Sequence, residues 1–145
     1  GDVIDVITGL DERGSPATRR LLRDDAMHTL IYVIREDCIW CARNEANFAA
    51  IAGSGRSQVL VVALGMPPER ARSYLVERGL AGAEILLNPS VESQRKLGVV
   101  ATPKTLVVDA SGVVRQVWSG AYVDSDAREV ERFFGVQLPG LVGGD

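Results

Sequence analysis

The fold of this chain is decided by one stretch, residues 30–41, which reads LIYVIREDCIWC. Its first part, Leu30–Ile34, is an apolar run with the length and β-branched content of a buried strand. Its last part holds the only two cysteines of the chain, Cys38 and Cys41. A strand that leads through Cys-x-x-Cys into a helix places the first sulfur at the helix N-terminus, where unpaired N–H groups and the helix dipole favour a thiolate. The second sulfur lies about one turn further along the helix, within reach of a disulfide.

Other uses of a Cys-x-x-Cys pair fit the sequence less well. A tetrahedral zinc site needs four ligands, and the only further Cys or His is His28. Covalent haem attachment requires His directly after Cys41, where this chain has Ala42. A structural disulfide stays open, although so short a ring removes little entropy from the unfolded chain. The spacing therefore favours a redox dithiol, with no metal and no cofactor other than the Cys38–Cys41 disulfide itself.

A second informative stretch, residues 98–114, predicts a loop followed by a β-hairpin. β-Branched runs lie on both sides of Asp109–Gly112, whose composition is typical of a tight turn. The loop ahead of the hairpin contains Thr102 and Pro103.

The remaining elements follow from apolar periodicity and from capping residues. We expect strands at 3–7, 58–64 and 84–88, a short capped helix or turn at 16–23, and helices from the dithiol to Gly53, at 69–79, from Ser90 to Leu97 and from Asp124 or Ser125 to Gly135. Proline and glycine dominate beyond that point, so we expect residues 136–145 to form a loose tail.

The order of these elements resembles the thioredoxin superfamily over nearly the whole chain. Within it, the chain most resembles the TlpA-type thiol-disulfide reductases and related redoxins. The resemblance implies an α/β thioredoxin-like fold, in which helices flank a central mixed β-sheet. It also implies an inserted strand–helix unit, within residues 58–89, before the loop that contains Pro103.

The same resemblance implies roles for the site residues. Cys38 and Cys41 are the catalytic pair, and Pro103 follows a cis peptide bond and packs against them. The proline turn leaves the backbone of Thr102 free to pair with an extended substrate peptide. Trp40 lies between the cysteines and is expected to be partly exposed, where it contacts a partner or packs against neighbouring loops. A simpler interpretation, in which Pro103 only begins a strand, stays open.

The chain also departs from the family pattern. Asp37 stands directly before the first cysteine, where family members usually have Trp. Asn44 and Ala46 stand where the TlpA type tends to have Glu and Pro, and Tyr32 stands where thioredoxins bury an acid that takes a proton from the second cysteine. Glu45 is next to the expected acid but about a hundred degrees around a helix. The resemblance therefore leaves the proton acceptor of Cys41 unassigned.

Carboxylates near the dithiol are expected to tune its acidity. The helix N-terminus stabilises a Cys38 thiolate, whereas Glu36 and Asp37 destabilise it by charge repulsion. With Glu45 as a third such group, we expect a weakly acidic Cys38 and a reductant rather than an oxidant, because a less stable thiolate favours the disulfide.

Composition bounds the functional class. With 145 residues, of which 46% are hydrophobic, the chain is long enough for one domain over residues 1–145. A net charge of −3 without a basic block argues against nucleic acid or an anionic membrane surface as the partner. The apolar runs are strand-sized, so no membrane span is predicted. Because the chain opens with Gly1, we expect a trimmed or mature form that has lost any signal peptide or N-terminal anchor.

These observations predict a thiol-disulfide oxidoreductase that reduces protein disulfides through a mixed disulfide and is itself reset by an upstream thiol reductant. The resemblance implies a bacterial extracytoplasmic setting, often tethered to the membrane. The alternative is a binding or chaperone module that keeps the fold without catalysis.

Overall fold

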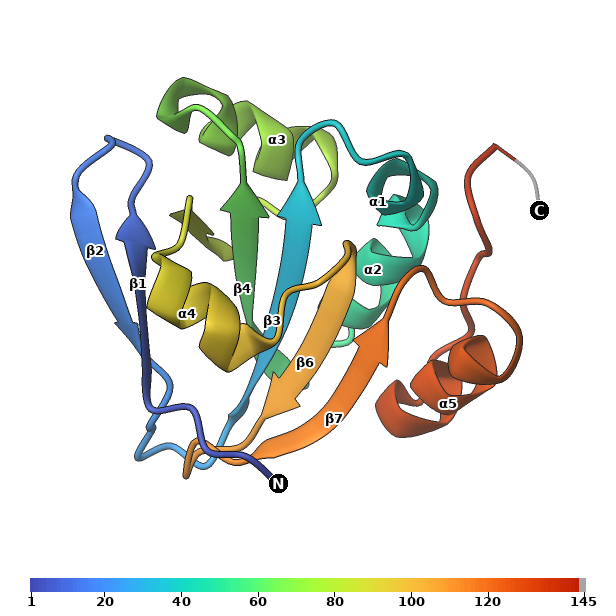
Figure 1. Ribbon diagram of the computed structural model, residues 1–145. Coiled ribbons are helices and arrows are strands. Elements are labelled where there is room, and N and C mark those ends of the chain that lie inside the picture. Colours follow the sequence, from blue (N-terminus) through green and yellow to red (C-terminus); the bar gives the residue numbers. More distant parts are fainter. Residues whose placement is uncertain (144–145) are drawn as a thin grey trace.

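A computed structural model describes residues 1–143 of the chain, which form a seven-stranded sheet covered by helices (Figure 1). The strands are β1 (Val6–Leu10), β2 (Pro16–Arg20), β3 (His28–Arg35), β4 (Ser57–Leu64), β5 (Glu84–Leu87), β6 (Lys104–Val108) and β7 (Val114–Ser119). The helices are α1 (Ile39–Arg43), α2 (Glu45–Ala52), α3 (Ala71–Glu77), α4 (Val91–Leu97) and α5 (Asp124–Phe134), and a 3-10 turn, η1 (Pro68–Arg70), precedes α3.

The sheet is mixed, and its order is β2-β1-β5-β4-β3-β6-β7. The central strands β3, β4 and β5 are parallel, because each connection between them passes through helices. The flanking pairs β3–β6, β6–β7, β1–β5 and β1–β2 are antiparallel. This arrangement confirms the predicted thioredoxin-like α/β fold with a mixed central sheet.

Two apolar cores lie on the two faces of the sheet, and β3 contributes side chains to both. Leu30, Tyr32 and Ile34 point into one core, and Ile31 and Val33 into the other, as the two-residue period of a strand requires. The first core is completed by α1, α2, α3 and α5, and the second by α4 and the N-terminal segment (Figure 1). Full burial of one such aliphatic side chain contributes about 1.5–3 kcal/mol. The strand that leads to the dithiol is therefore held from both sides.

The N-terminal hairpin differs from the sequence prediction. The first strand is Val6–Leu10 rather than residues 3–7, and the predicted helix or turn at 16–23 is wrong, because Pro16–Arg20 forms the edge strand β2. The cause is the turn between them, in which the Asp11 carboxylate accepts hydrogen bonds from the backbone N–H groups of Arg13 and Ser15. Ser15 therefore closes a hairpin instead of capping a helix.

The helix predicted after the dithiol is divided at Asn44. α1 ends at Arg43 and α2 begins at Glu45, because Asn44 has φ −93° and ψ 0°, outside the helical region. By contrast, the helix from Ser90 to Leu97 and the hairpin with its turn at Asp109–Gly112 are present as predicted.

The segment after α5 runs back along the helices of the first core (Figure 1). Leu138 N–H donates to Glu131 (2.8 Å), and Gly140 N–H donates to the side chain of Asn47 on α2 (2.8 Å). Val142 N–H donates to the carbonyl oxygen of Arg43 at the end of α1 (2.7 Å). The sequence predicts a loose tail over 136–145, yet its described part is hydrogen-bonded to three helices; residues 144–145 lie outside the described residues.

Within residues 1–143, no helix has both the length and the apolar character that crossing a lipid bilayer requires.

Candidate active site

The dithiol lies where β3 ends and α1 begins. Cys38 is the N-cap of α1, and its sulfur accepts a hydrogen bond from the backbone N–H of Cys41 (3.0 Å). The two cysteines form a disulfide, with their Cα atoms 5.2 Å apart. Cys38 is partly exposed, whereas Cys41 is only 6% exposed. The first sulfur is therefore the one that an approaching molecule can reach.

The loop before β6 contacts this disulfide. The Thr102–Pro103 peptide bond is cis, as the family resemblance implies. The Thr102 hydroxyl donates to the Cys38 sulfur (3.3 Å), and the Thr102 carbonyl oxygen lies 3.5 Å from the same sulfur. The antiparallel pairing of β6 with β3 brings the loop to this position, since Lys104 is opposite Val33. The structure thus brings together residues that are 64 positions apart in the sequence.

Exposed apolar side chains occur in both segments that meet at the reachable sulfur, the start of α1 and the loop that contains Thr102. Ile39 and Trp40 are 73% and 49% exposed, and Val100, in the loop before Thr102, is 94% exposed. The guanidinium of Arg43 lies 4.6 Å from the centre of the Trp40 ring, where it makes a cation–π contact. The predicted partial exposure of Trp40 is confirmed.

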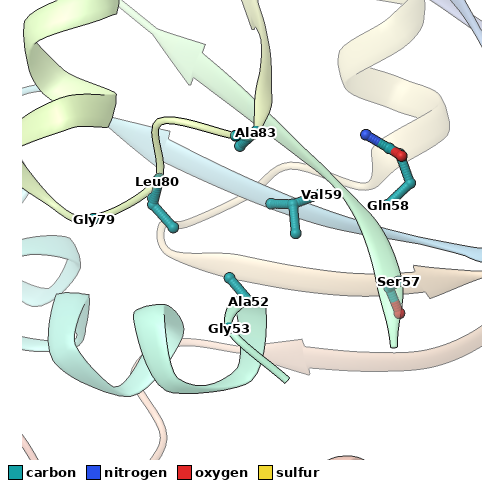
Figure 2. A pocket seen from close by; sticks show the side chains of 9 residues that line it. Ala52, Gly53, Ser57, Gln58, Val59, Gly79, Leu80 and Ala83 are labelled. Carbon is teal, nitrogen blue, oxygen red and sulfur yellow. The ribbon is translucent and has the colours of Figure 1, made fainter. Parts of the chain in front are cut away.

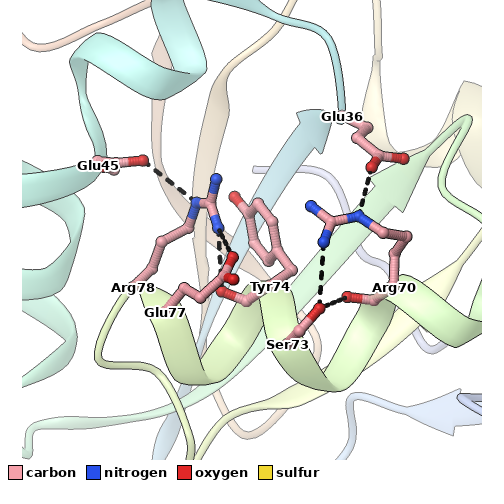
Figure 3. A network of polar contacts seen from close by, with 7 residues as sticks. All are labelled: Glu36, Glu45, Arg70, Ser73, Tyr74, Glu77 and Arg78. Carbon is pink, nitrogen blue, oxygen red and sulfur yellow. Dashed lines mark hydrogen bonds and ion pairs between the residues drawn. The ribbon is translucent and has the colours of Figure 1, made fainter.

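Two of the three predicted tuning carboxylates are engaged by arginines from the α3 region (Figure 3). Glu36 accepts a hydrogen bond from Arg70 (2.8 Å), which raises the pKa of that guanidinium. Glu45 pairs with Arg78 (3.2 Å). Such exposed pairs contribute only about 0.2–1 kcal/mol each, but they place a positive charge beside each carboxylate.

The third carboxylate, Asp37, lies exposed directly before Cys38. Of the three carboxylates, Asp37 is therefore the one whose charge is not offset by Arg70 or Arg78. The influence of Glu36, Asp37 and Glu45 on the acidity of Cys38 stays a prediction.

A buried polar network lies beneath the dithiol, and sequence reasoning did not foresee it. The Asn44 side chain donates to the Tyr32 hydroxyl (3.0 Å) and accepts from the side chain of Asn47 (3.2 Å) and from the backbone N–H of Tyr122 (3.0 Å). Asn44 and Asn47 are fully buried. The two positions at which the chain departs from the family acids, Tyr32 and Asn44, are thus hydrogen-bonded to each other. We call Asn44, Asn47, Tyr32 and Tyr122 the Asn44 network.

The phenols of this network stay protonated at physiological pH. Burial is the first cause that raises the pKa of Tyr32 and of Tyr122 well above the usual value of a tyrosine. The Asn44 network is therefore uncharged.

A cavity of about 290 Å³ lies elsewhere, between the end of α2, the start of β4 and the loop from α3 to β5 (Figure 2). Its lining consists of small, apolar or uncharged residues, among them Ser57, Gln58 and Leu80. Because β3 and β4 are parallel, the start of β4 lies at the end of the sheet opposite the dithiol. The cavity is not part of the candidate site.

Several solved structures of bacterial thiol-disulfide proteins are similar to this fold. A thiol:disulfide interchange protein from Bacteroides sp. is 18% identical and matches over 94% of this chain and 90% of its own, with a TM-score of 0.60. A secreted Mycobacterium tuberculosis disulfide oxidoreductase, homologous to E. coli DsbE, is 13% identical over 89% of this chain and 95% of its own, with a TM-score of 0.66. The exposed lipoprotein thioredoxin of Streptococcus pneumoniae is 19% identical over 88% of this chain and 98% of its own, with a TM-score of 0.61.

Sequence comparison adds nothing to this likeness, because no family model and no curated protein matches the chain significantly. The match in structure extends over nearly the full length on both sides, and identities this low establish the fold. The chain therefore has the thioredoxin-like fold of the bacterial thiol:disulfide interchange proteins, with a Cys-x-x-Cys disulfide of its own.

Proposed function

We propose that this protein is a thiol-disulfide oxidoreductase that reduces disulfides in other proteins. The observation that carries the proposal is the Cys38–Cys41 disulfide at the start of α1, whose partly exposed sulfur lies in contact with Thr102 of the cis-proline loop. A disulfide that serves only stability has no need of one reachable sulfur beside an exposed loop, whereas thiol-disulfide exchange depends on access to the attacked sulfur.

In the reduced protein, the Cys38 thiolate attacks one sulfur of a substrate disulfide. A bond forms between Cys38 and that sulfur, the substrate S–S bond breaks, and the other substrate sulfur leaves with the electron pair and takes up a proton. Cys41 then attacks Cys38, the mixed disulfide breaks, and the second substrate thiol is released. The substrate gains two electrons and two protons, and the protein ends as the Cys38–Cys41 disulfide. An upstream dithiol resets it by the reverse exchange.

The surroundings of Cys38 suit an extended polypeptide rather than a small molecule. The polar groups of Thr102 lie at the sulfur, and a peptide that pairs with this loop would place its own side chains against Ile39, Trp40 and Val100. We therefore assign substrate contacts to Trp40, Thr102 and Pro103, and protein disulfides as the substrate class.

An extracytoplasmic setting in bacteria fits this chemistry, because protein disulfides form and persist there. Two structurally similar proteins are described as secreted and as an exposed lipoprotein. We propose the bacterial cell envelope or periplasm as the location, with the protein tethered to the membrane.

Insulin reduction tests the proposal. With dithiothreitol as the reductant, the wild-type chain should accelerate precipitation of the insulin B chain, and Cys38→Ser should abolish the acceleration. The matched control is Ser111→Ala, because this exposed turn residue lies away from the dithiol. Equal rates for wild type and Cys38→Ser would refute catalysis and favour a binding or chaperone module.

A further inference from the structure

Among the described residues, the layer beneath the dithiol contains no buried acid. Among residues 1–143, the buried polar side chains other than the tyrosines are Thr29, Asn44, Asn47, Ser93 and Thr105. None of them can take up a proton at physiological pH. The buried groups available around the Cys41 thiol are therefore amides, hydroxyls and apolar side chains.

Asn44 is the centre of that layer and lies one turn after Cys41 on the same side of the helix. Its backbone N–H donates to the carbonyl oxygens of Trp40 (3.0 Å) and Cys41 (3.3 Å), which closes the last turn of α1. Its side chain connects this turn to Tyr32 on β3, to Tyr122 in the loop before α5 and to Asn47 on α2. One amide thus ties the helix that carries Cys41 to three other parts of the fold.

The network also reaches the C-terminal segment. The Asn47 side chain that donates to Asn44 accepts in turn from the backbone N–H of Gly140 (2.8 Å). On the other side, the ring of Phe48 stacks on Tyr32, with 3.8 Å between ring centres and an angle of 4° between planes. Cys41 belongs to the same core cluster as Tyr32 and Phe48. Cys41 is therefore joined to these uncharged groups by the backbone hydrogen bond from Asn44 and by membership of one core cluster.

We propose that Asn44 is the positioning residue of Cys41, and that Cys41 resolves the mixed disulfide without a buried acid or base. The inference rests on the proposed function, because it concerns the second step of that exchange.

In that step, the proton that Cys41 loses is matched by the proton that the leaving substrate sulfur gains. The Cys41 thiol loses its proton to solvent and attacks the Cys38 sulfur. The Cys38–Cys41 bond forms, the bond from Cys38 to the substrate sulfur breaks, and that sulfur leaves with the electron pair and is protonated from solvent. The rate should follow one ionisation, that of the Cys41 thiol.

The groups around Cys41 are consistent with a single ionisation. Burial raises the pKa of the phenol on β3, of the one in the loop before α5 and of the one on α3, which are Tyr32, Tyr122 and Tyr74. The charged groups on the neighbouring elements include Glu45 and Glu77 with Arg78, Glu36 with Arg70, Arg43 beside Trp40, and Asp37. Lys104, next to Pro103, donates to the carbonyl oxygen of Gly98 (2.6 Å), and burial lowers the pKa of its amine. Cys38 does not titrate in this step, because it is held in the mixed disulfide.

The experiment mixes the fully reduced chain with 5,5′-dithiobis(2-nitrobenzoate) in a stopped-flow instrument. Attack by Cys38 releases one coloured thiolate and leaves a mixed disulfide, and attack by Cys41 releases a second. The rate of the second release is measured from about pH 5 to about pH 9, the range that covers carboxylate and thiol ionisation. We expect one ionisation in the wild type. Two ionisations in the wild type would show an acid or base coupled to Cys41 and would overturn the inference.

Variants at Asn44 separate positioning from simple loss of stability. Asn44→Asp places an ionisable group of the same shape in the network, so a second ionisation should appear in the profile. Asn44→Ala removes the links to Tyr32 and Tyr122, and should slow the second release about 10- to 100-fold while the first stays within about twofold. A second release that is unchanged in Asn44→Ala, or a profile that is unchanged in Asn44→Asp, refutes the positioning role.

The matched control is Asn88→Ala, which loses an amide bonded to the backbone of Gly65 (2.8 Å) and Met66 (3.0 Å) rather than to a member of the Asn44 network. Asn88 also has a φ of 47°, so alanine there is strained and the variant is destabilised. Its second release should match the wild type within about twofold; a slowing as large as that of Asn44→Ala would mean that general destabilisation explains both. Insulin reduction is scored separately: two normal releases without insulin turnover would refute the proposed function and leave the inference standing.

Discussion

At the scale of single residues, the two cysteines have unlike surroundings. Cys38 is partly exposed, caps α1 and contacts Thr102, whereas Cys41 is buried above the Asn44 network. The sulfurs differ mainly in access, and access decides which one an outside disulfide meets first.

Trapping variants should therefore behave asymmetrically. Cys41→Ser should accumulate a mixed disulfide with a protein substrate through Cys38, because no second thiol resolves it. Cys38→Ser should capture almost none, since the remaining thiol is buried. Non-reducing electrophoresis with mass spectrometry of the adduct measures both. Efficient trapping by the Cys38→Ser variant alone would invert the assignment of attacking and resolving residues.

Among the neighbouring carboxylates, Asp37 should have the largest effect on the acidity of Cys38. Asp37→Asn should lower the pH midpoint of Cys38 alkylation in the reduced protein by about 0.2 to 0.7 pH units, because an exposed charge interaction is worth about 0.2–1 kcal/mol. Removal of a negative neighbour favours the thiolate, so the shift is downward.

Glu36→Gln is the comparison that the structure suggests, because Arg70 already offsets the charge of Glu36. Its shift should be smaller than that of Asp37→Asn. A larger shift for Glu36→Gln, or an upward shift for Asp37→Asn, contradicts this account of the electrostatics.

At the scale of elements, α1 depends on residues far away in the sequence. It is a helix of only five residues, too short to be stable alone. Its supports are β3 before it, Asn44 after it and the C-terminal segment beside it, where Arg43 Nε donates to the carbonyl oxygen of Val142 (3.3 Å). The element that carries the dithiol is thus built by tertiary contacts.

Truncation before Leu138 should destabilise the protein, because it removes the backbone donors to Glu131, Asn47 and Arg43. At about 0.5–1.5 kcal/mol for each hydrogen bond, the free energy of unfolding should fall by roughly 1.5–4.5 kcal/mol, as measured by urea denaturation. Gln137→Ala, at an exposed position of the same segment, should change it by less than about 0.5 kcal/mol. A truncated chain as stable as the wild type would show that the segment contributes nothing.

At the scale of the whole molecule, the dithiol lies at one end of the sheet with the exposed side chains of Ile39 and Trp40, and the cavity of Figure 2 lies at the other end. The two ends are separated by the buried strands β3 and β4. Substitutions in this cavity should therefore leave the rate of disulfide reduction unchanged.

Trp40→Ala should lower kcat/KM for insulin by roughly two- to tenfold, because an aromatic contact is worth about 0.5–1.5 kcal/mol beyond its buried area. For a small disulfide such as oxidised glutathione, the change should be within about twofold, since a small substrate does not extend to the indole. Gln58→Ala, in the distant cavity, should leave both values unchanged. Equal losses for both substrates in Trp40→Ala would assign the indole a packing role instead of substrate contact.

The sequence by itself determined the central strands, the dithiol at the start of a helix, and the loop and hairpin around Pro103. The resemblance of their order to the thioredoxin superfamily then implied the fold. These features are local: an apolar run with a two-residue period, a Cys-x-x-Cys spacing and a turn cluster each act over a few residues. The sequence also placed Glu36, Asp37 and Glu45 near the dithiol, because they adjoin it along the chain.

Only the tertiary structure decided what those residues face. The arginines that offset the charges of Glu36 and Glu45 come from η1 and from the end of α3. Pro16–Arg20 is a strand because it pairs with β1. Tyr32 and Asn44 look like two separate losses of an acid in the sequence, yet in the fold they form one uncharged contact. The reason is physical: side-chain partners across a sheet or between helices are set by the packing of elements, and no short-range pattern in the chain encodes which distant residue will fill the space opposite.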